Sequence, residues 1–181
     1  MAVHLGQNRA FGVITVLIAA ALAGCTSGPS SSVPNAAGPT APATTAAPSP
    51  TYLADLKPVE GPSPISGAAK IDGKKYEHSI VQPSYLGSTI IETQYDLGRA
   101  CDQLTFTAGL PDDSTSTGSV QFEVYGDDKQ LMSVRLGFGA ESQQTISIAN
   151  YLRLKVRNTG IEGRGKLSAG WGNAAIRCRT S

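Results

Sequence analysis

The sequence predicts an all-β fold, a two-sheet antiparallel sandwich, over residues 51–181. Apolar and polar residues alternate with period two in several segments after Ser88, which is typical of strands with one face in water. Turn-forming residues separate these segments at the spacing of about 8–12 residues found in sandwiches and barrels. No stretch keeps a helical period over three turns.

Each expected strand is bounded by residues that favour turns. Gly, Pro, Asn and Asp interrupt the alternation at 109–113, 126–128, 158–160 and 163–165, because they adopt backbone conformations that suit turns better than strands. Since the strands are evenly amphipathic, a sandwich is favoured over a barrel. The expected strands are, in chain order, 104–108, 120–124, 131–136, 144–148, 152–157 and 174–178.

The first 24 residues predict a secretory signal peptide. Arg9 and the amino terminus are positive, and the uncharged run 10–23 is shorter than the roughly 20 apolar residues of a membrane span. The run ends in Leu22-Ala23-Gly24-Cys25, which resembles the bacterial lipobox, where the cysteine receives a diacylglycerol. The alternative is an ordinary signal peptide with a chance cysteine. We expect residues 1–24 to be removed and a lipid on Cys25 to anchor the protein at the cell membrane, on its extracytoplasmic face.

Residues 25–50 form a segment rich in Ser, Thr, Pro, Ala and Gly, without charge. Such a composition buries too little apolar surface to offset chain entropy, so disorder is expected. Its prolines bias the backbone toward extended conformations and predict a semi-rigid stalk between the lipid and residues 51–181. The same composition is compatible with O-glycans.

The charge balance bears on the class of partner. Loss of Arg9 with the signal peptide leaves 14 basic and 14 acidic side chains, which argues against nucleic acid. The charge is uneven, because residues 51–150 hold seven basic and thirteen acidic side chains, whereas 151–181 hold seven basic and one acidic. The basic residues of 151–181 alternate with apolar ones, so we interpret them as solvated faces of strands.

Two cysteines remain besides Cys25. An exported compartment is oxidising, so Cys101 and Cys178 are predicted to form a disulfide. On the chain-entropy model, closing so long a loop stabilises the fold by roughly 4 kcal/mol. The alternative is a pair of buried free thiols.

Motifs spread over residues 51–178 carry a family resemblance. They lie at 52–59, 73–80, 95–98, 107–113 and 118–127, and the last is Trp171-Gly172-Asn173-Ala174. Together they resemble the NPCBM family of carbohydrate-binding modules, which typically ends in Trp-Ala-Asp-Ala. The resemblance implies a galactose-binding-like jelly roll of two antiparallel sheets. It also implies non-catalytic recognition of a carbohydrate, such as an envelope glycan or a galactose-containing glycan.

The chain departs from the family around the late tryptophan. Leu167-Ser168-Ala169-Gly170 replaces the family's acidic residues before it, and Asn173 replaces the acidic residue after it. The departure keeps a second hypothesis open, in which the same scaffold serves as a protein-interaction or structural module of the envelope without binding sugar.

Five residues are the candidates for sugar binding: Trp171, Asn173, His78, Tyr76 and Glu77. An aromatic plane packs against the C–H face of a sugar ring, while amides and carboxylates bind its hydroxyl groups. Two interpretations of Trp171 stay open, because a single tryptophan can equally cap the core of a small β domain. The alternative role of His78 is a structural hydrogen bond.

The sequence predicts no catalytic residue and no resident cofactor. His4 leaves with the signal peptide, and the one other histidine, His78, has no nucleophile motif to accompany it. Calcium is the candidate ion, at Asp112 and Asp113, although the spacing is not that of an EF-hand. The alternative for this pair is a turn, where aspartates bond to nearby backbone donors.

Overall fold

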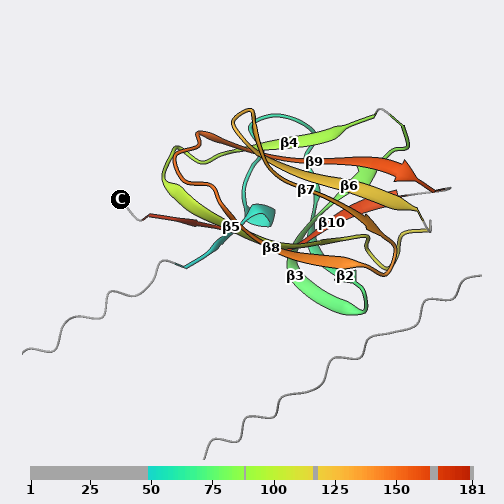
Figure 1. The fold of residues 1–181 in the computed structure, drawn as a ribbon. Helices are drawn as coiled ribbons and strands as arrows, with labels where there is room; N and C mark the ends of the chain where they lie inside the picture. The colour runs from blue at the N-terminus through green and yellow to red at the C-terminus, as the bar shows by residue number, and fades with distance from the viewer. Residues whose placement is uncertain (1–48, 88, 116–117, 164–166, 180–181) are drawn as a thin grey trace, which may run out of the picture. The chain divides into compact units, whose positions relative to one another are not determined.

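The computed structural model describes residues 49–87, 89–115, 118–163 and 167–179. Within this part, two antiparallel sheets pack face to face as two layers (Figure 1). The predicted signal peptide, Cys25 and nearly all of the predicted stalk 25–50 lie outside the described residues. Among the described residues, no helix has the length and apolar character needed to cross a membrane.

The predicted jelly-roll sandwich is confirmed, and all six predicted segments overlap strands β5 to β10. Four strands, β1 to β4, were not predicted from alternation. In chain order the elements are β1 (Thr51–Tyr52), the 3-10 helix η1 (Leu53–Asp55), β2 (Ile65–Ile71), β3 (Lys74–Ser84), β4 (Ile91–Asp96), β5 (Cys101–Gly109), β6 (Ser119–Gly126), β7 (Lys129–Gly137), β8 (Glu141–Ser147), β9 (Arg153–Glu162) and β10 (Leu167–Cys178).

Strand β10 organises the larger sheet. The six-stranded sheet runs β2-β3-β10-β5-β8, with β1 beside the end of β10, and the four-stranded sheet runs β4-β9-β6-β7. Strand β3 pairs with β10 only as far as Ile80↔Trp171. Beyond this point β1 takes the place of β3, in the register Tyr52↔Ala175. The pairing of β10 with β5 is irregular between Gly172 and Ala175, so Asn173 lies in a bulge.

The core lies between the two sheets and centres on Trp171, which is fully buried. Its ring centroid is 5.2 Å from that of Phe106 and 5.2 Å from that of Phe122, the latter edge to face. Phe106 comes from the six-stranded sheet and Phe122 from the four-stranded one, so the tryptophan ring joins the two layers. Aromatic pairs at such distances add to the stabilisation that burial provides.

A buried chain of hydrogen bonds also joins the layers. Trp171 Nε1 donates to Gln82 Oε1 at 3.1 Å, and Gln82 Nε2 donates to Thr93 Oγ1 at 2.8 Å. The Thr93 hydroxyl in turn donates to the Pro62 carbonyl at 2.8 Å. A buried polar group without a partner costs free energy, so this chain lets Gln82 and Thr93 lie in the core.

The predicted disulfide is confirmed. Cys101 and Cys178 are bonded across neighbouring positions of β5 and β10, and 77 residues separate them in the chain. The bond therefore links the start of β5 to the end of β10, the last strand of the sandwich.

The strands of the β2–β3 hairpin belong to the six-stranded sheet, and the tip of the hairpin packs on the outer side of β5 and β10. Figure 1 shows the hairpin at the foot of the domain. Ile71, near its tip, is fully buried although it lies outside the inter-sheet core. A Cβ at Gly109 would be 2.3 Å from Ile71 Cγ2, and one at Gly170 would be 3.1 Å from Ile71 Cδ1. Two glycines that face each other across β5 and β10 thus make the space in which the hairpin seats.

Candidate functional site

Trp171 does not take part in a binding surface. Its side chain is fully buried between Phe106 and Phe122, and its N–H is bonded to Gln82. The prediction that Trp171 contacts a sugar is therefore wrong, and the alternative role in the core is the observed one. The reason is the register of β10, in which Trp171 pairs with the inward-facing residues Ile80 and Ala108.

Three other candidates gather on the outer face of the same sheet. The backbone N–H of His78 donates to Asn173 Oδ1 at 3.0 Å, which ties β3 to the bulge of β10. Asn173 has a φ of 46°, in the left-handed region that asparagine tolerates better than most residues. The His78 ring stacks on Tyr52, with centroids 4.0 Å apart and planes inclined by 10°. Tyr76 lies on the same stretch of β3, two residues from His78.

A hollow beside Tyr76 and Asn173, which we call the polar pocket, has a volume of about 180 Å³. That volume would hold roughly six water molecules at about 30 Å³ each. Thr105 and Thr107 of β5 and Gln143 of β8 contribute hydroxyl and amide groups from neighbouring positions of the sheet. The lining residues are Tyr76, Thr105, Phe106, Thr107, Gln143, Gly172 and Asn173.

The ring of Tyr76 is held at the edge of the pocket from two sides. It packs over Gly172, where a Cβ would be 2.7 Å from Tyr76 Cγ. Its hydroxyl donates to Glu141 Oε2 at 2.8 Å, and the Lys74 ammonium pairs with the other oxygen of Glu141. The bond from Lys74, followed by that from Tyr76, holds the pKa of the Glu141 carboxyl below its ordinary value. Burial, followed by the bond to Glu141, raises the pKa of Tyr76.

Glu77 is not part of the polar pocket. Its carboxylate pairs with the Lys75 ammonium at 2.8 Å, and both side chains are exposed. The pairing of β3 with β2 is irregular between Tyr76 and Ser79, so Glu77 lies at a bulge. Sugar contact by Glu77 stays a prediction.

A second and larger hollow, which we call the groove, has a volume of about 610 Å³. Asp112 and Asp113 lie at its rim, in the turn that leaves β5. Asp112 accepts a hydrogen bond from Gly73 N at 3.1 Å and pairs with Lys70 at 3.8 Å. The lining residues are Ile65, Ala68, Ala69, Lys70, Val81, Pro83, Pro111, Asp112, Asp113 and Ser168.

Calcium at Asp112 and Asp113 stays a prediction. In the part of the chain that the structure describes, no three His, Cys, Asp or Glu side chains come close enough together to hold a metal ion. The Asp112 carboxylate accepts a hydrogen bond from the backbone N–H of Gly73, which is 39 positions away in the chain, so this bond joins two turns rather than serving the turn of Asp112 itself.

Several pocket residues were not identified from the sequence. Thr105, Thr107 and Gln143 occupy ordinary polar positions in alternating strands, so nothing in the sequence separates them from other solvated positions. Tyr52 and Glu141 acquire their roles only through contacts with β3. The one available signal was Gly170-Trp171-Gly172. Glycines within a strand often indicate that another segment of the chain or a ligand packs closely against that face of the strand.

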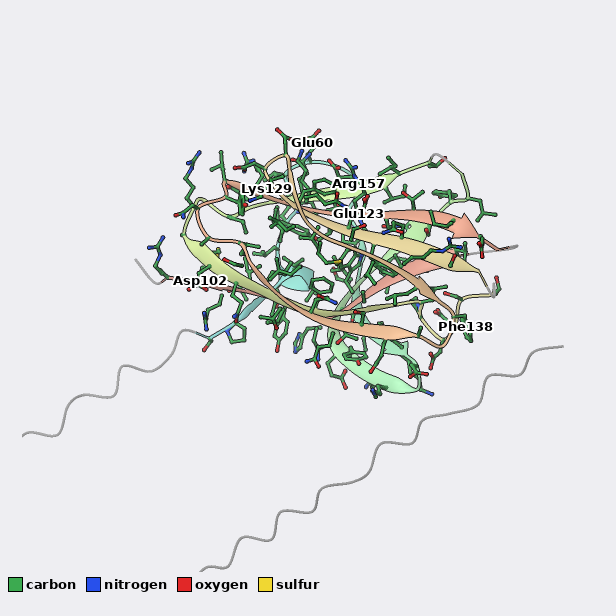
Figure 2. The ribbon with its side chains drawn as sticks, in the orientation of Figure 1. Glu60, Asp102, Glu123, Lys129, Phe138 and Arg157 are labelled. Atoms are coloured by element: carbon green, nitrogen blue, oxygen red, sulfur yellow. A yellow bond between two sulfur atoms is a disulfide. The ribbon has the colours of Figure 1, made fainter. Side chains whose placement is uncertain are left out.

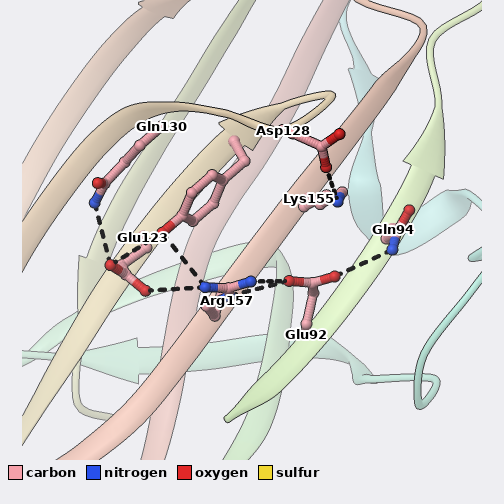
Figure 3. A network of polar contacts seen from close by, with 8 residues as sticks. Glu92, Gln94, Glu123, Asp128, Gln130, Lys155 and Arg157 are labelled. Carbon is pink, nitrogen blue, oxygen red and sulfur yellow. Dashed lines mark hydrogen bonds and ion pairs between the residues drawn. The ribbon is translucent and has the colours of Figure 1, made fainter.

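The outer face of the four-stranded sheet carries a network of charged side chains (Figure 3). Arg157 donates to Glu92 Oε2 through Nη2 at 2.6 Å and through Nε at 3.0 Å. The Arg157 guanidinium carbon lies 4.6 Å from the ring centroid of Tyr125, and Lys155 donates to Asp128 at 2.8 Å. The charges of this face therefore pair with one another.

Comparison with known proteins places these features in context. The family model described as NPCBM/NEW2 domain matches residues 52–177. A comparison with curated protein sequences found no match.

Similar solved structures are CBM51 modules. The tandem CBM51 modules of Sp3GH98, a family 98 glycoside hydrolase from Streptococcus pneumoniae SP3-BS71, align with a TM-score of 0.59 and 13% identity over 72% of this chain and 47% of that chain. CBM51 from Clostridium perfringens GH95, in complex with methyl-galactose, aligns with a TM-score of 0.56 and 16% identity over 71% of this chain and 99% of that one. CBM51-2 with the INT domains of Clostridium perfringens ZmpB, in complex with GlcNAc, aligns with a TM-score of 0.57 and 16% identity over 72% of this chain and 32% of that chain.

At these identities the likeness shows a shared fold. The chain spans about half the length of the tandem-module structure and about a third of the ZmpB structure.

Proposed function

Because the chain belongs to the NPCBM/NEW2 domain family, we propose that its sandwich binds a carbohydrate without catalysis, in the polar pocket. The observation that carries the proposal is the lining of this pocket, where an aromatic ring from Tyr76 stands beside the hydroxyl and amide groups of Thr105, Thr107, Gln143 and Asn173. CBM51 structures that share the fold hold methyl-galactose and GlcNAc, which supports a galactose-containing or related envelope glycan as the ligand.

The chemistry of the pocket suits a sugar ring. The Asn173 carbonyl oxygen is occupied by the His78 N–H, which leaves its amide N–H groups to donate to a ligand. Gln143 can donate and accept, and the threonine hydroxyls can do both. The ring of Tyr76 offers an apolar plane for the C–H groups of the sugar, whereas the stacked rings of Tyr52 and His78 lie outside the lining of the pocket. The pocket is small, so we expect it to hold one ring of a longer glycan.

The sequence supports a location for this activity. The lipobox-like Leu22-Ala23-Gly24-Cys25 and residues 25–50 would anchor the sandwich by a lipid at the extracytoplasmic face of the cell membrane, at the end of a stalk. A glycan of the envelope would then lie within reach. Replacement of Cys25→Ser should move the protein from the membrane fraction to the soluble fraction, and retention in the membrane fraction would contradict the anchor.

Calorimetric titration of the mature chain with methyl-galactose and GlcNAc, followed by a glycan array, tests the binding. Gln143→Ala removes one hydrogen-bonding group from the pocket and should weaken binding by about three- to tenfold. Gln121→Ala is the matched control, because Gln121 lies on the four-stranded sheet and bonds to Ser133. Absence of binding to every glycan by a folded protein, or equal effects of the two substitutions, would overturn the proposal.

A further inference from the structure

The groove differs in chemistry from the polar pocket. None of its ten lining residues is aromatic, and most of its surface comes from the alkyl side chains of Ile65, Ala68, Ala69, Val81 and the two prolines. Its volume of about 610 Å³ falls within the range of ligand pockets, roughly 300–1,000 Å³. A sugar gains much of its affinity from stacking on aromatic rings, so these walls suit aliphatic groups better.

One wall of the groove is an edge strand. β2 is the first strand of the six-stranded sheet and pairs with β3 on one side only. On its other side, Lys70 O accepts a hydrogen bond from Asp112 N at 2.8 Å, and Ile71 bridges Pro111. This pairing stops after two residues, and no described strand continues it along Ile65 to Ala69. The backbone groups of an edge strand are a ready template for an added strand.

Among the described residues, one negative charge at the rim of the groove has no partner. Lys70 balances Asp112, its partner at 3.8 Å. Asp113 is exposed, and within the described residues it makes neither a hydrogen bond nor an ion pair. A ligand that places a cation at this rim would supply the missing charge.

We propose that the groove binds an extended peptide segment of a partner protein, with small aliphatic side chains and one lysine or arginine. The peptide adds to the free edge of β2 and continues the pairing that Pro111 and Asp112 begin. Its alternate side chains contact Ile65, Val81 and Pro83, and its cation pairs with Asp113. This site is separate from the polar pocket and does not depend on sugar binding.

The probe is the capped hexapeptide Ala-Val-Ala-Lys-Ala-Val, titrated into the isotopically labelled mature chain and followed by NMR. Amide shifts should concentrate at Ala68, Ala69 and Ser168. A peptide with glutamate in place of lysine should bind about tenfold more weakly, through loss of the charge-assisted bond. Of the two peptides that carry N-methyl groups on alternate amides, the one methylated on the amides that face β2 keeps its side chains but cannot donate to the β2 carbonyls, so it should not bind.

Asp113→Lys should weaken binding of the lysine peptide about tenfold and strengthen binding of the glutamate peptide. Glu60→Lys makes the same charge change at an exposed position, and Figure 2 shows Glu60 at the opposite side of the domain from the hairpin. It should leave the affinity unchanged. Equal binding by the peptide methylated on the amides that face β2, shifts at Gln143 and Thr107 instead, or methyl-galactose shifting the groove amides would each overturn the proposal.

Discussion

The two outer faces of the sandwich differ in how their surfaces are built. On the four-stranded sheet, residues from adjacent strands pair across the surface, as Arg157 does with Glu92 and Lys155 with Asp128. On the six-stranded sheet, glycines replace side chains in the middle strands and a hairpin packs over them, which leaves hollows along its sides. Both faces pair charged side chains, and the second also has hollows, one of which is lined by hydroxyl and amide groups.

The difference teaches where to look for binding in such a fold. The side chains of Arg157 and Glu92 are only 26% and 23% exposed and bond to each other, so the network around Arg157 offers few unpaired groups. A concave face with convergent amides and hydroxyls is rarer and more informative. Three predictions test this contrast, beginning with the core that both faces share.

Trp171→Ala should have the largest effect, because it removes the side chain that joins the two layers and leaves Gln82 Oε1 without its donor. We expect a loss of about 3–5 kcal/mol in the free energy of unfolding, measured in denaturant. Trp171→Phe should lose less stability and keep the affinity for sugar, because the residue belongs to neither face. A selective loss of affinity in Trp171→Phe at unchanged stability would show that the tryptophan acts in binding after all.

Gly172→Ala should have an intermediate effect, since its Cβ would lie 2.7 Å from the Tyr76 ring. We expect about 1–3 kcal/mol of destabilisation and a loss of sugar binding, as the displaced ring opens the polar pocket. Gly137→Ala is the control on the four-stranded sheet, where a Cβ would lie 3.9 Å from Gly118 O. That substitution should be neutral or stabilising by up to about 1 kcal/mol in thermal or denaturant unfolding. Similar losses from both substitutions would remove the contrast between the faces.

The smallest effect should come from acid. The pKa of Glu141 is held below its ordinary value of 4.5, chiefly by Lys74 and then by Tyr76. The ionised Glu141 carboxylate therefore stabilises the folded state fully at pH values above 4.5, and this stabilisation is lost as the pH falls through the lower pKa of the folded state. Sugar affinity, titrated from neutral to acid pH, should fall in this window as Tyr76 is released.

Two variants check the acid effect. Glu141→Gln should flatten the fall in affinity, because the carboxyl that titrates is gone. Asp128 also has a lowered pKa, caused by Lys155, but it lies on the four-stranded sheet. Asp128→Asn should accordingly leave the acid dependence of binding unchanged. A flattened pH profile in that variant would show that Asp128, and not Glu141, causes the loss of affinity.

Alternation in the sequence was sufficient for the strands with one wet face. It was not sufficient for β3 and β4, because the buried residues Ser79, Gln82, Ser84 and Thr93 read as polar and break the apolar pattern. The start of β10 was not predicted for the opposite reason. Residues 167–172 are buried on both faces of the sheet and show no alternation. The disulfide needed only the count of cysteines and the predicted compartment.

The sequence by itself therefore determined the sandwich, its staple and the presence of chemically suitable residues at Tyr76, His78 and Asn173. Only the tertiary structure decided that Trp171 faces inward and that Gln143 and Thr107 share a pocket with Tyr76. The physical reason is that period two is a property of the local chain. Which face of a sheet is covered depends on register and on the hairpin that glycines 109, 170 and 172 admit.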